Sequence, residues 1–204
     1  MHPYLNRLGV PQIIQNFFEP WHSTDAAGNL VFDYGGEMEK FAMAYHKIPA
    51  ANRLWLAGDT NHIIQQIMIC YCSMDAIAYA ALNQHKLAQL DRILFASTGS
   101  IIGESMFNLV RNNTTAVNII GSNDLISRAA DVKIAALLSG KTADITLQNE
   151  IVRCVVQYRH FNFPVEEFSL SAFEKKSGYR LGCRTFKPHY ANSWMDQLCS
   201  SFRK

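Results

Sequence analysis

The sequence predicts an α/β protein built on a parallel sheet, and two features of its middle third carry this prediction. Three short apolar runs, each suited to a strand buried on both faces, lie at 67–71, 92–97 and 116–121. A segment of helical character follows each run. Because strand–helix–strand units of this length form right-handed crossovers, we expect the three strands to be adjacent and parallel, with helices on both faces of the sheet.

The elements before this core predict a small α+β segment, assigned to residues 1–62. It contains one short amphipathic helix, which Pro11 starts, and two short extended runs that glycine turns close. The expected ranges of the helix and the two runs are 12–18, 30–34 and 54–57.

The core itself is assigned to residues 63–142. Its three helices are expected at 73–83, 103–111 and 125–138. Ser73 is placed to cap the first of these helices, and Gly140 is placed to end the third.

The last segment, residues 143–204, predicts a β-containing extension packed on the core. The run at 151–163 is rich in β-branched and aromatic residues, which indicates one or two strands closed by Pro164. A short helix is expected at 171–176, with Gly178 as its stop.

Composition places the chain among ordinary globular proteins. It has 204 residues, of which 49% are hydrophobic and 18% charged. No apolar run reaches the roughly 18 residues that span a bilayer, and the first residues lack the pattern of a secretory signal. We therefore expect a cytoplasmic protein with no membrane contact.

The cysteines predict neither disulfides nor a structural zinc site. Five are present, an odd number without a Cys-x-x-Cys pair. Cys70 and Cys72 lie two residues apart at the first core strand, so they are expected to share one face as buried free thiols.

Charge is balanced over the whole chain, at +2, but not along it. Residues 175–204 contain seven basic side chains against one acid, Asp196. The basic residues are Lys175, Lys176, Arg180, Arg184, Lys187, Arg203 and Lys204. Such a segment is suited to nucleic-acid phosphates, and a solvated surface is the competing interpretation.

The polar residues that follow the core strands indicate where a site would form. The carboxyl ends of parallel strands converge on one edge, where open α/β sheets bind ligands. Tyr71, the 97–99 turn and the 122–124 turn are all expected at this edge. The Ser97-Thr-Gly-Ser100 run has the small residues of a phosphate-binding loop, although a plain tight turn is the favoured interpretation of it.

Three runs, at 67–78, 93–100 and 116–130, resemble in order and spacing the Toprim domain of the bacterial primase and mobilization-protein group. That family places a Glu four residues before an Asp in the first run, and an Asp-x-Asp pair followed by Gly-Arg in the third. Here Tyr71 stands at the Glu position, before Asp75. The Asp-x-Asp reads Ser122-Asn123-Asp124, and the Gly-Arg reads Ser127-Arg128.

The resemblance extends to both ends of the chain. The segment at 188–198 is similar to a Lys-Asp-Trp-Asn-x-x-Leu ending, with Ser193 in place of Asp and Met195 in place of Asn. The opening at 2–11 resembles the segment that precedes the Toprim core in the same group.

Toprim chemistry requires clustered carboxylates that hold Mg²⁺, a cation that demands oxygen ligands. Tyr71 and Ser122 are neutral side chains, so they cannot replace carboxylates. Asp124 remains at a metal position, and Asp75 lies in a first helical turn, where an acid favours the helix dipole. The resemblance thus implies a degenerate site at Tyr71, Asp75, Ser122 and Asp124, without catalytic residues and with at most weak Mg²⁺ binding through Asp124.

The resemblance implies a non-catalytic accessory protein in replication or mobilization of mobile DNA, which binds nucleic acid or a partner protein. Candidate nucleic-acid contacts are Arg128, Lys175, Lys176, Arg180, Arg184 and Lys187. One alternative is an active Mg-dependent phosphotransfer enzyme, a primase or nuclease relative that uses Asp124. A third is a pure protein-interaction subunit.

Overall fold

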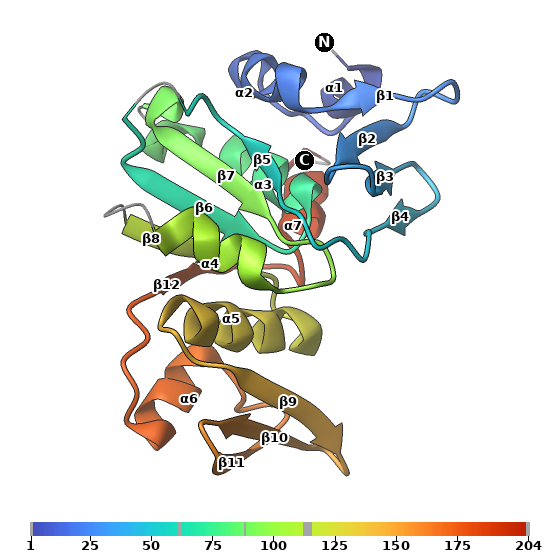
Figure 1. Ribbon diagram of the computed structural model, residues 1–204. Helices are drawn as coiled ribbons and strands as arrows, with labels where there is room; N and C mark the ends of the chain where they lie inside the picture. Colours follow the sequence, from blue (N-terminus) through green and yellow to red (C-terminus); the bar gives the residue numbers. More distant parts are fainter. Residues whose placement is uncertain (1, 61–62, 88, 112–115, 203–204) are drawn as a thin grey trace.

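The computed structural model describes residues 2–60, 63–87, 89–111 and 116–202. A five-stranded sheet with strand order β12-β8-β6-β7-β5 lies at its centre (Figure 1). Its strands are β5 (Trp55–Ala57), β6 (Gln66–Cys70), β7 (Ile93–Ser97), β8 (Ala116–Ile120) and β12 (Arg184–Phe186). Four of them run parallel, and β5 pairs antiparallel with β7.

The predicted adjacency of the three core strands is confirmed. Strand β6 lies between β7 and β8 and is parallel to both, so that Ile67 lies opposite Leu94 on one side and Val117 on the other. The helices that follow are α3 (Ser73–Leu82), α4 (Glu104–Arg111) and α5 (Leu125–Leu138). The sheet as a whole is mixed rather than purely parallel, because β5 adds an antiparallel edge.

Helices cover both faces of this sheet, as the sequence predicts for strands buried on two sides. Met68 and Cys70 of β6 face one apolar cluster, which includes residues of α2 (Gln12–Phe18), α3 and α7 (Trp194–Ser201). Ile67 and Ile69 face a second cluster, formed with α4, α5 and the C-terminal elements. The two clusters follow from the alternation of side chains along a strand.

The N-terminal segment is α+β, as predicted, and contains one helix more than expected. It has helices α1 (Pro3–Arg7) and α2, a 3₁₀ turn η1 (Glu19–Trp21) and a four-stranded antiparallel sheet. The sheet strands are β1 (Ser23–Thr24), β2 (Leu30–Asp33), β3 (Met38–Phe41) and β4 (His46–Lys47). Buried Trp55 of the central sheet stacks on Phe18 and packs edge-on against Phe32, so aromatic contacts tie the segment to the core.

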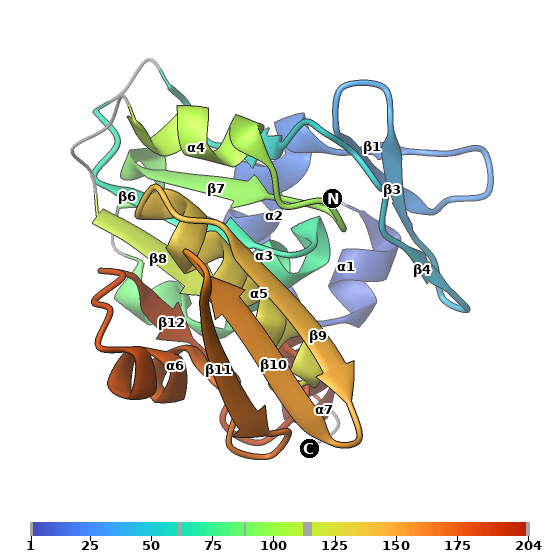
Figure 2. The same cartoon turned by 60° about the horizontal axis from the view of Figure 1, so that its bottom comes forward.

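The C-terminal elements form a layer over α5. Strands β9 (Ala143–Gln148), β10 (Ile151–Val156) and β11 (Arg159–Pro164) make an antiparallel sheet that packs with α6 (Leu170–Ser177) against α5 (Figure 2). The run at 151–163 is therefore a hairpin of two strands. Strand β9 was not predicted, although Ala143 and Ile145 alternate toward the core with exposed neighbours, as a half-buried strand requires.

The remaining turns agree with their glycines. Gly178 ends α6 in the left-handed region, at φ 76°, and Gly140 follows α5 at φ 68°. Two short 3₁₀ turns, η2 (Gln84–Lys86) and η3 (Leu90–Arg92), join α3 to β7. No helix in the described part of the chain combines the length and apolar character that crossing a membrane requires.

Candidate functional site

The strand edge gathers the three turns that the sequence places there. Tyr71 follows β6 directly, and its carbonyl oxygen accepts a hydrogen bond of 3.0 Å from Ser97 Oγ at the end of β7. The N–H of Thr98 donates to Cys70 O at 3.0 Å. On the other side, Gly121 N–H donates to Phe186 O of β12 at 3.0 Å. The convergence of these segments therefore follows from parallel strand pairing.

Tyr71 is half-buried at this edge, and burial raises the pKa of its hydroxyl above the ordinary value. The nearby Cys72 and Asp124 act in the same direction. The side chain at the position of the family Glu is therefore a neutral phenol at physiological pH, which offers no charge to a magnesium ion.

The turn after β8 is held by a lysine from the C-terminal segment. Lys187 Nζ donates to Ser122 O at 2.7 Å and forms an ion pair with buried Asp131 of α5. A Cβ atom at Gly121 would lie 2.5 Å from both Lys187 Nζ and Asp131 Oδ1, so a side chain there would displace these two charged groups. An ammonium group therefore lies against the turn where the family has its Asp-x-Asp pair.

Asp131 is an acid that sequence reasoning missed. Its side chain is buried, and desolvation raises its pKa to about 6, while Lys187 acts in the opposite direction. The signal in the sequence was a single acid between apolar neighbours in the 125–138 helix, which does not by itself reveal a partner some 56 positions later.

Asp124 is exposed and serves as the N-cap of α5, where its Oδ1 accepts a hydrogen bond of 2.9 Å from Ser127 N–H. Asp75 lies in the first turn of α3, as expected, but its side chain is buried. Desolvation raises the pKa of Asp75 to about 6, and a hydrogen bond from Cys72 opposes this rise.

The 97–100 turn is a tight turn in which the amides of Thr98 and Ser100 already have partners. Ser100 N–H donates to Pro49 O at 2.9 Å, and Thr98 N–H is bonded to Cys70 as described above. Gly99 adopts a φ of +62°, and a Cβ atom there would lie 2.8 Å from Pro49 O. These amides are therefore not oriented toward a phosphate, which favours the simpler of the two interpretations of this run.

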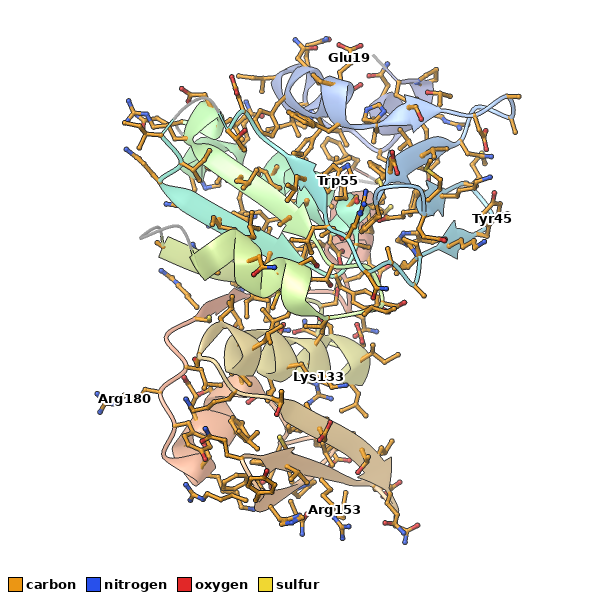
Figure 3. All side chains as sticks on the ribbon, viewed as in Figure 1. Glu19, Tyr45, Trp55, Lys133, Arg153 and Arg180 are labelled. Atoms are coloured by element: carbon orange, nitrogen blue, oxygen red, sulfur yellow. The ribbon has the colours of Figure 1, made fainter. Side chains whose placement is uncertain are left out.

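An apolar groove of about 330 Å³ lies beside Tyr71, between α5 and β9. Its described lining is mainly aliphatic, and Lys133 is the charged side chain among it. Ile126 and Leu147 on its walls are 68% and 56% exposed, values that are high for side chains of this type. Figure 3 shows Lys133 on α5, facing the C-terminal layer.

Three of the six candidate nucleic-acid contacts are held by hydrogen bonds or an ion pair within the protein. Arg128 Nη1 donates to Phe168 O at 3.0 Å, and Lys176 Nζ donates to Asn162 O while lying over the Phe163 ring. Lys187 is paired with Asp131. These contacts are structural ties between α5, α6 and the strands.

The other three candidates, Lys175, Arg180 and Arg184, are exposed. Arg180 points away from the molecule in Figure 3. Arg184 lies over the Phe186 ring on the α3 side of the sheet, opposite to the side on which Lys187 meets α5. Arg203 and Lys204 lie outside the described residues.

A second constellation, centred on Glu39 of β3, was not predicted. Glu39 is fully buried. Its Oε2 accepts hydrogen bonds from Ser73 N–H at 2.9 Å and from the Tyr34 hydroxyl at 2.6 Å, and its Oε1 lies 2.8 Å from His46 Nε2. Burial, together with Glu39, raises the pKa of the Tyr34 hydroxyl, which therefore remains a donor.

Glu39 also corrects the prediction that Ser73 caps α3. The N-cap residue is Cys72, which makes no side-chain capping bond, and Ser73 is the first residue of the helix. The carboxylate of Glu39 binds the free N–H of Ser73 instead, and the Ser73 hydroxyl lies 3.0 Å from the Tyr34 hydroxyl. A helix N-terminus favours a negative charge, so a buried acid from another sheet replaces the local cap.

Cys72 completes this constellation. Its thiol is buried, and desolvation, reinforced by Asp75 and Glu39, raises its pKa well above the ordinary value. A carboxylate oxygen of Glu39, a ring nitrogen of His46 and the Cys72 sulfur all lie within 4.8 Å of one another. All five cysteines are free, and Cys70 is buried in the same apolar cluster as Cys72, although Cys72 lies just beyond the strand.

Comparison of the chain with protein-family models, with curated proteins and with solved structures finds no match. The resemblance to Toprim domains is therefore a resemblance of the residue pattern at 67–78, 93–100 and 116–130 alone.

Proposed function

We propose that this chain is a Toprim-like domain that has lost metal-dependent phosphoryl transfer. In this proposal it is an accessory protein in the replication or mobilization of mobile DNA, and it binds a partner protein at the carboxyl edge of its central sheet. The observation that carries the proposal is the apolar groove beside Tyr71, which lies where a Toprim enzyme needs carboxylates.

The loss of chemistry is argued from charge. Magnesium takes oxygen ligands, and proteins hold it through one or two carboxylates together with water and substrate phosphates. The neutral side chains of Tyr71 and Ser122 stand at two positions where the Toprim pattern has carboxylates. The ammonium group of Lys187 lies against Ser122 O. A positive charge at this turn opposes the binding of a cation.

The alternative, a Mg-dependent phosphotransfer enzyme that uses Asp124, needs further acids near that residue. Asp75 and Asp131 are the two acids whose pKa Asp124 raises. Both are buried, and Asp131 is already paired with Lys187. The enzyme reading therefore requires these side chains to be rearranged.

Binding of a partner protein is argued from the groove. Exposed apolar surface of this kind marks sites of protein interaction, and the volume of about 330 Å³ accommodates several side chains. The charged lining residue is Lys133. The partner that fits is therefore an apolar segment that carries an acidic side chain. Nucleic acid is favoured less, because three of the six candidate basic side chains are held by contacts within the protein and the chain has a net charge of only +2.

A photo-crosslinking experiment tests the partner. A photoreactive amino acid replaces Leu147, at the groove, in cells that express the protein. We expect one discrete crosslinked species, which Ile126→Asp in the same chain removes. Tyr158, which is 96% exposed at the far end of β10, is the control position and should not give that species. Equal products from both positions would contradict the proposal.

Calorimetric titration with Mg²⁺ tests the loss of chemistry. We expect no tight binding by the unmodified protein. Sub-millimolar affinity that disappears in Asp124→Ala would instead favour the enzyme.

A further inference from the structure

Three donor atoms of different chemistry meet where the N-terminal sheet touches the first turn of α3. They come from β3 (Glu39), from the start of β4 (His46) and from the residue that precedes α3 (Cys72). All three lie within 4.8 Å of one another, and Glu39 Oε1 and His46 Nε2 are already 2.8 Å apart. The β3–β4 turn that carries Tyr45 in Figure 3 leads directly into His46.

The donors match a borderline transition metal rather than magnesium. Thiolate, imidazole and carboxylate are the three ligand types that zinc uses in proteins, whereas Mg²⁺ takes oxygen ligands. In a tetrahedral zinc site, bonds of about 2.0 to 2.3 Å place donor atoms some 3.3 to 3.8 Å apart. The three donors reach that geometry with side-chain shifts on the order of 1 Å.

We propose that Glu39, His46 and Cys72 form a binding site for one divalent transition-metal ion of the zinc class, which fastens the β3–β4 hairpin to the core. Three protein ligands leave a fourth coordination position for water. The side chain of His46 is 26% exposed while that of Glu39 is fully buried, so the ion enters from the His46 side.

Two features of the surroundings favour metal binding, although the N-terminus of α3 by itself favours a negative charge. The backbone N–H of Ser73 and the hydroxyl of Tyr34 hold the second oxygen of Glu39, so the orientation of this carboxylate is set before any ion binds. Ligands fixed by such outer hydrogen bonds bind metal more tightly. Asp75 adds a second buried carboxylate beside Cys72, and a divalent ion offsets the charge of both acids.

The competing reading is a metal-free ion pair between Glu39 and His46 beside an inert buried thiol. Both readings give a folded protein, and they differ in metal uptake. Only the metal reading requires the Cys72 thiol to lose its proton and to bond the ion through sulfur.

Cobalt titration separates the two readings. The full chain is stripped of metal with a chelator and titrated with Co²⁺, then with Zn²⁺. We expect one Co²⁺ per chain, with the thiolate-to-cobalt charge-transfer absorption that reports a Co–S bond, and displacement of Co²⁺ by Zn²⁺ but not by Mg²⁺. Thermal unfolding should shift upward with Zn²⁺, because the ion binds the folded state.

The variants assign the ligands. Cys72→Ser should remove the charge-transfer band, and the matched control Cys199→Ser, at a half-buried cysteine elsewhere, should keep it. His46→Ala should lower Zn²⁺ affinity by more than the roughly 10- to 100-fold that loss of an outer partner costs. His85→Ala, at an exposed histidine, should leave it unchanged.

Circular dichroism in chelator verifies that each variant is folded. Should Cys72→Ser unfold, the His46→Ala and His85→Ala pair still decides, since His46 is partly exposed. The absence of a cobalt–sulfur absorption band in the unmodified protein would overturn the proposal. An affinity for Zn²⁺ that His46→Ala leaves unchanged would overturn it as well.

Discussion

Glu39 Oε2 accepts a hydrogen bond of 2.9 Å from Ser73 N–H, and this contact joins the N-terminal sheet to the helix that starts at the central strand edge. The two residues are 34 positions apart. A buried carboxylate thus serves as the cap of α3 and as a partner of Tyr34 and His46 at once. The stability of the core is therefore coupled to the position of the β3–β4 hairpin.

Replacing Glu39 should be strongly destabilising. In chelator, we expect Glu39→Ala to lower the free energy of unfolding by roughly 3 to 5 kcal/mol, because it leaves buried donors without an acceptor. Glu39→Gln keeps one acceptor oxygen and should cost less. Urea unfolding measures both, with Glu37→Ala as the exposed control, for which the expected change is within about 0.5 kcal/mol. Equal effects at the two positions would contradict the capping role.

Asp131 should make stability depend on pH. Its folded pKa of about 6 lies above the ordinary value of 3.8, so the folded state binds the proton more tightly than the unfolded state. The stabilisation of the folded state by this proton on Asp131 is complete below pH 3.8, and it is lost as the pH rises through about 6. The site accounts for roughly 3 kcal/mol of unfolding free energy over that window.

Asp131→Asn removes the titrating group, so the variant does not lose this stabilisation as the pH rises. The unfolding free energy of the variant minus that of the unmodified protein should therefore increase between pH 4 and pH 6. Urea unfolding at several pH values measures this difference. A difference that is constant with pH would show that Asp131 does not titrate in this range. Lys187, its partner, and Asp124 are the charged groups that act on it.

Introducing the acids of the Toprim pattern should create affinity for Mg²⁺. We expect Tyr71→Glu combined with Ser122→Asp to bind Mg²⁺ more tightly than the unmodified protein, because it adds two carboxylates near Asp124. Without metal the double variant should be less stable, since like charges then lie close together. Calorimetry and thermal unfolding with and without Mg²⁺ measure both effects. Adding Asp124→Ala should reverse the gain in affinity.

Gly99 should not tolerate a side chain. Its φ of +62° lies in the left-handed region, and a Cβ atom would lie 2.8 Å from Pro49 O. Gly99→Ala should destabilise the protein by roughly 1 to 3 kcal/mol. Gly103→Ala is the matched control, because its nearest neighbour, an Ile101 methyl, is 3.9 Å away and its φ is not positive. Comparable unfolding midpoints for the two variants would contradict this account.

The basic side chains of the C-terminal segment should separate into two kinds. Lys187→Ala should lower stability, because it leaves buried Asp131 unpaired.

Arg180→Ala with Arg184→Ala should leave stability unchanged and reduce whatever DNA binding occurs at low salt. Such binding should be weak and steeply salt-dependent. Fluorescence anisotropy with single- and double-stranded oligonucleotides measures it, and tight binding that persists at high salt would favour the nucleic-acid function.

The local pattern of the sequence was sufficient for the centre of the fold. Continuous apolar runs predicted β6, β7 and β8, and glycines and proline marked the ends of α2, α5 and α6. These features depend on residues close together in the chain, so periodicity and turn chemistry reveal them. The gathering of Tyr71 and Ser122 at one edge followed from parallel pairing.

Only the tertiary structure decided which polar groups meet. Glu39 reaches Ser73 across 34 positions, and Lys187 reaches Ser122 across 65. The edge strands β5 and β12 come from the two flanking segments, and both are only three residues long. Such contacts depend on how separate elements pack rather than on local pattern. For this reason the spacing of the cysteines did not reveal that Cys72 lies beside Glu39 and His46.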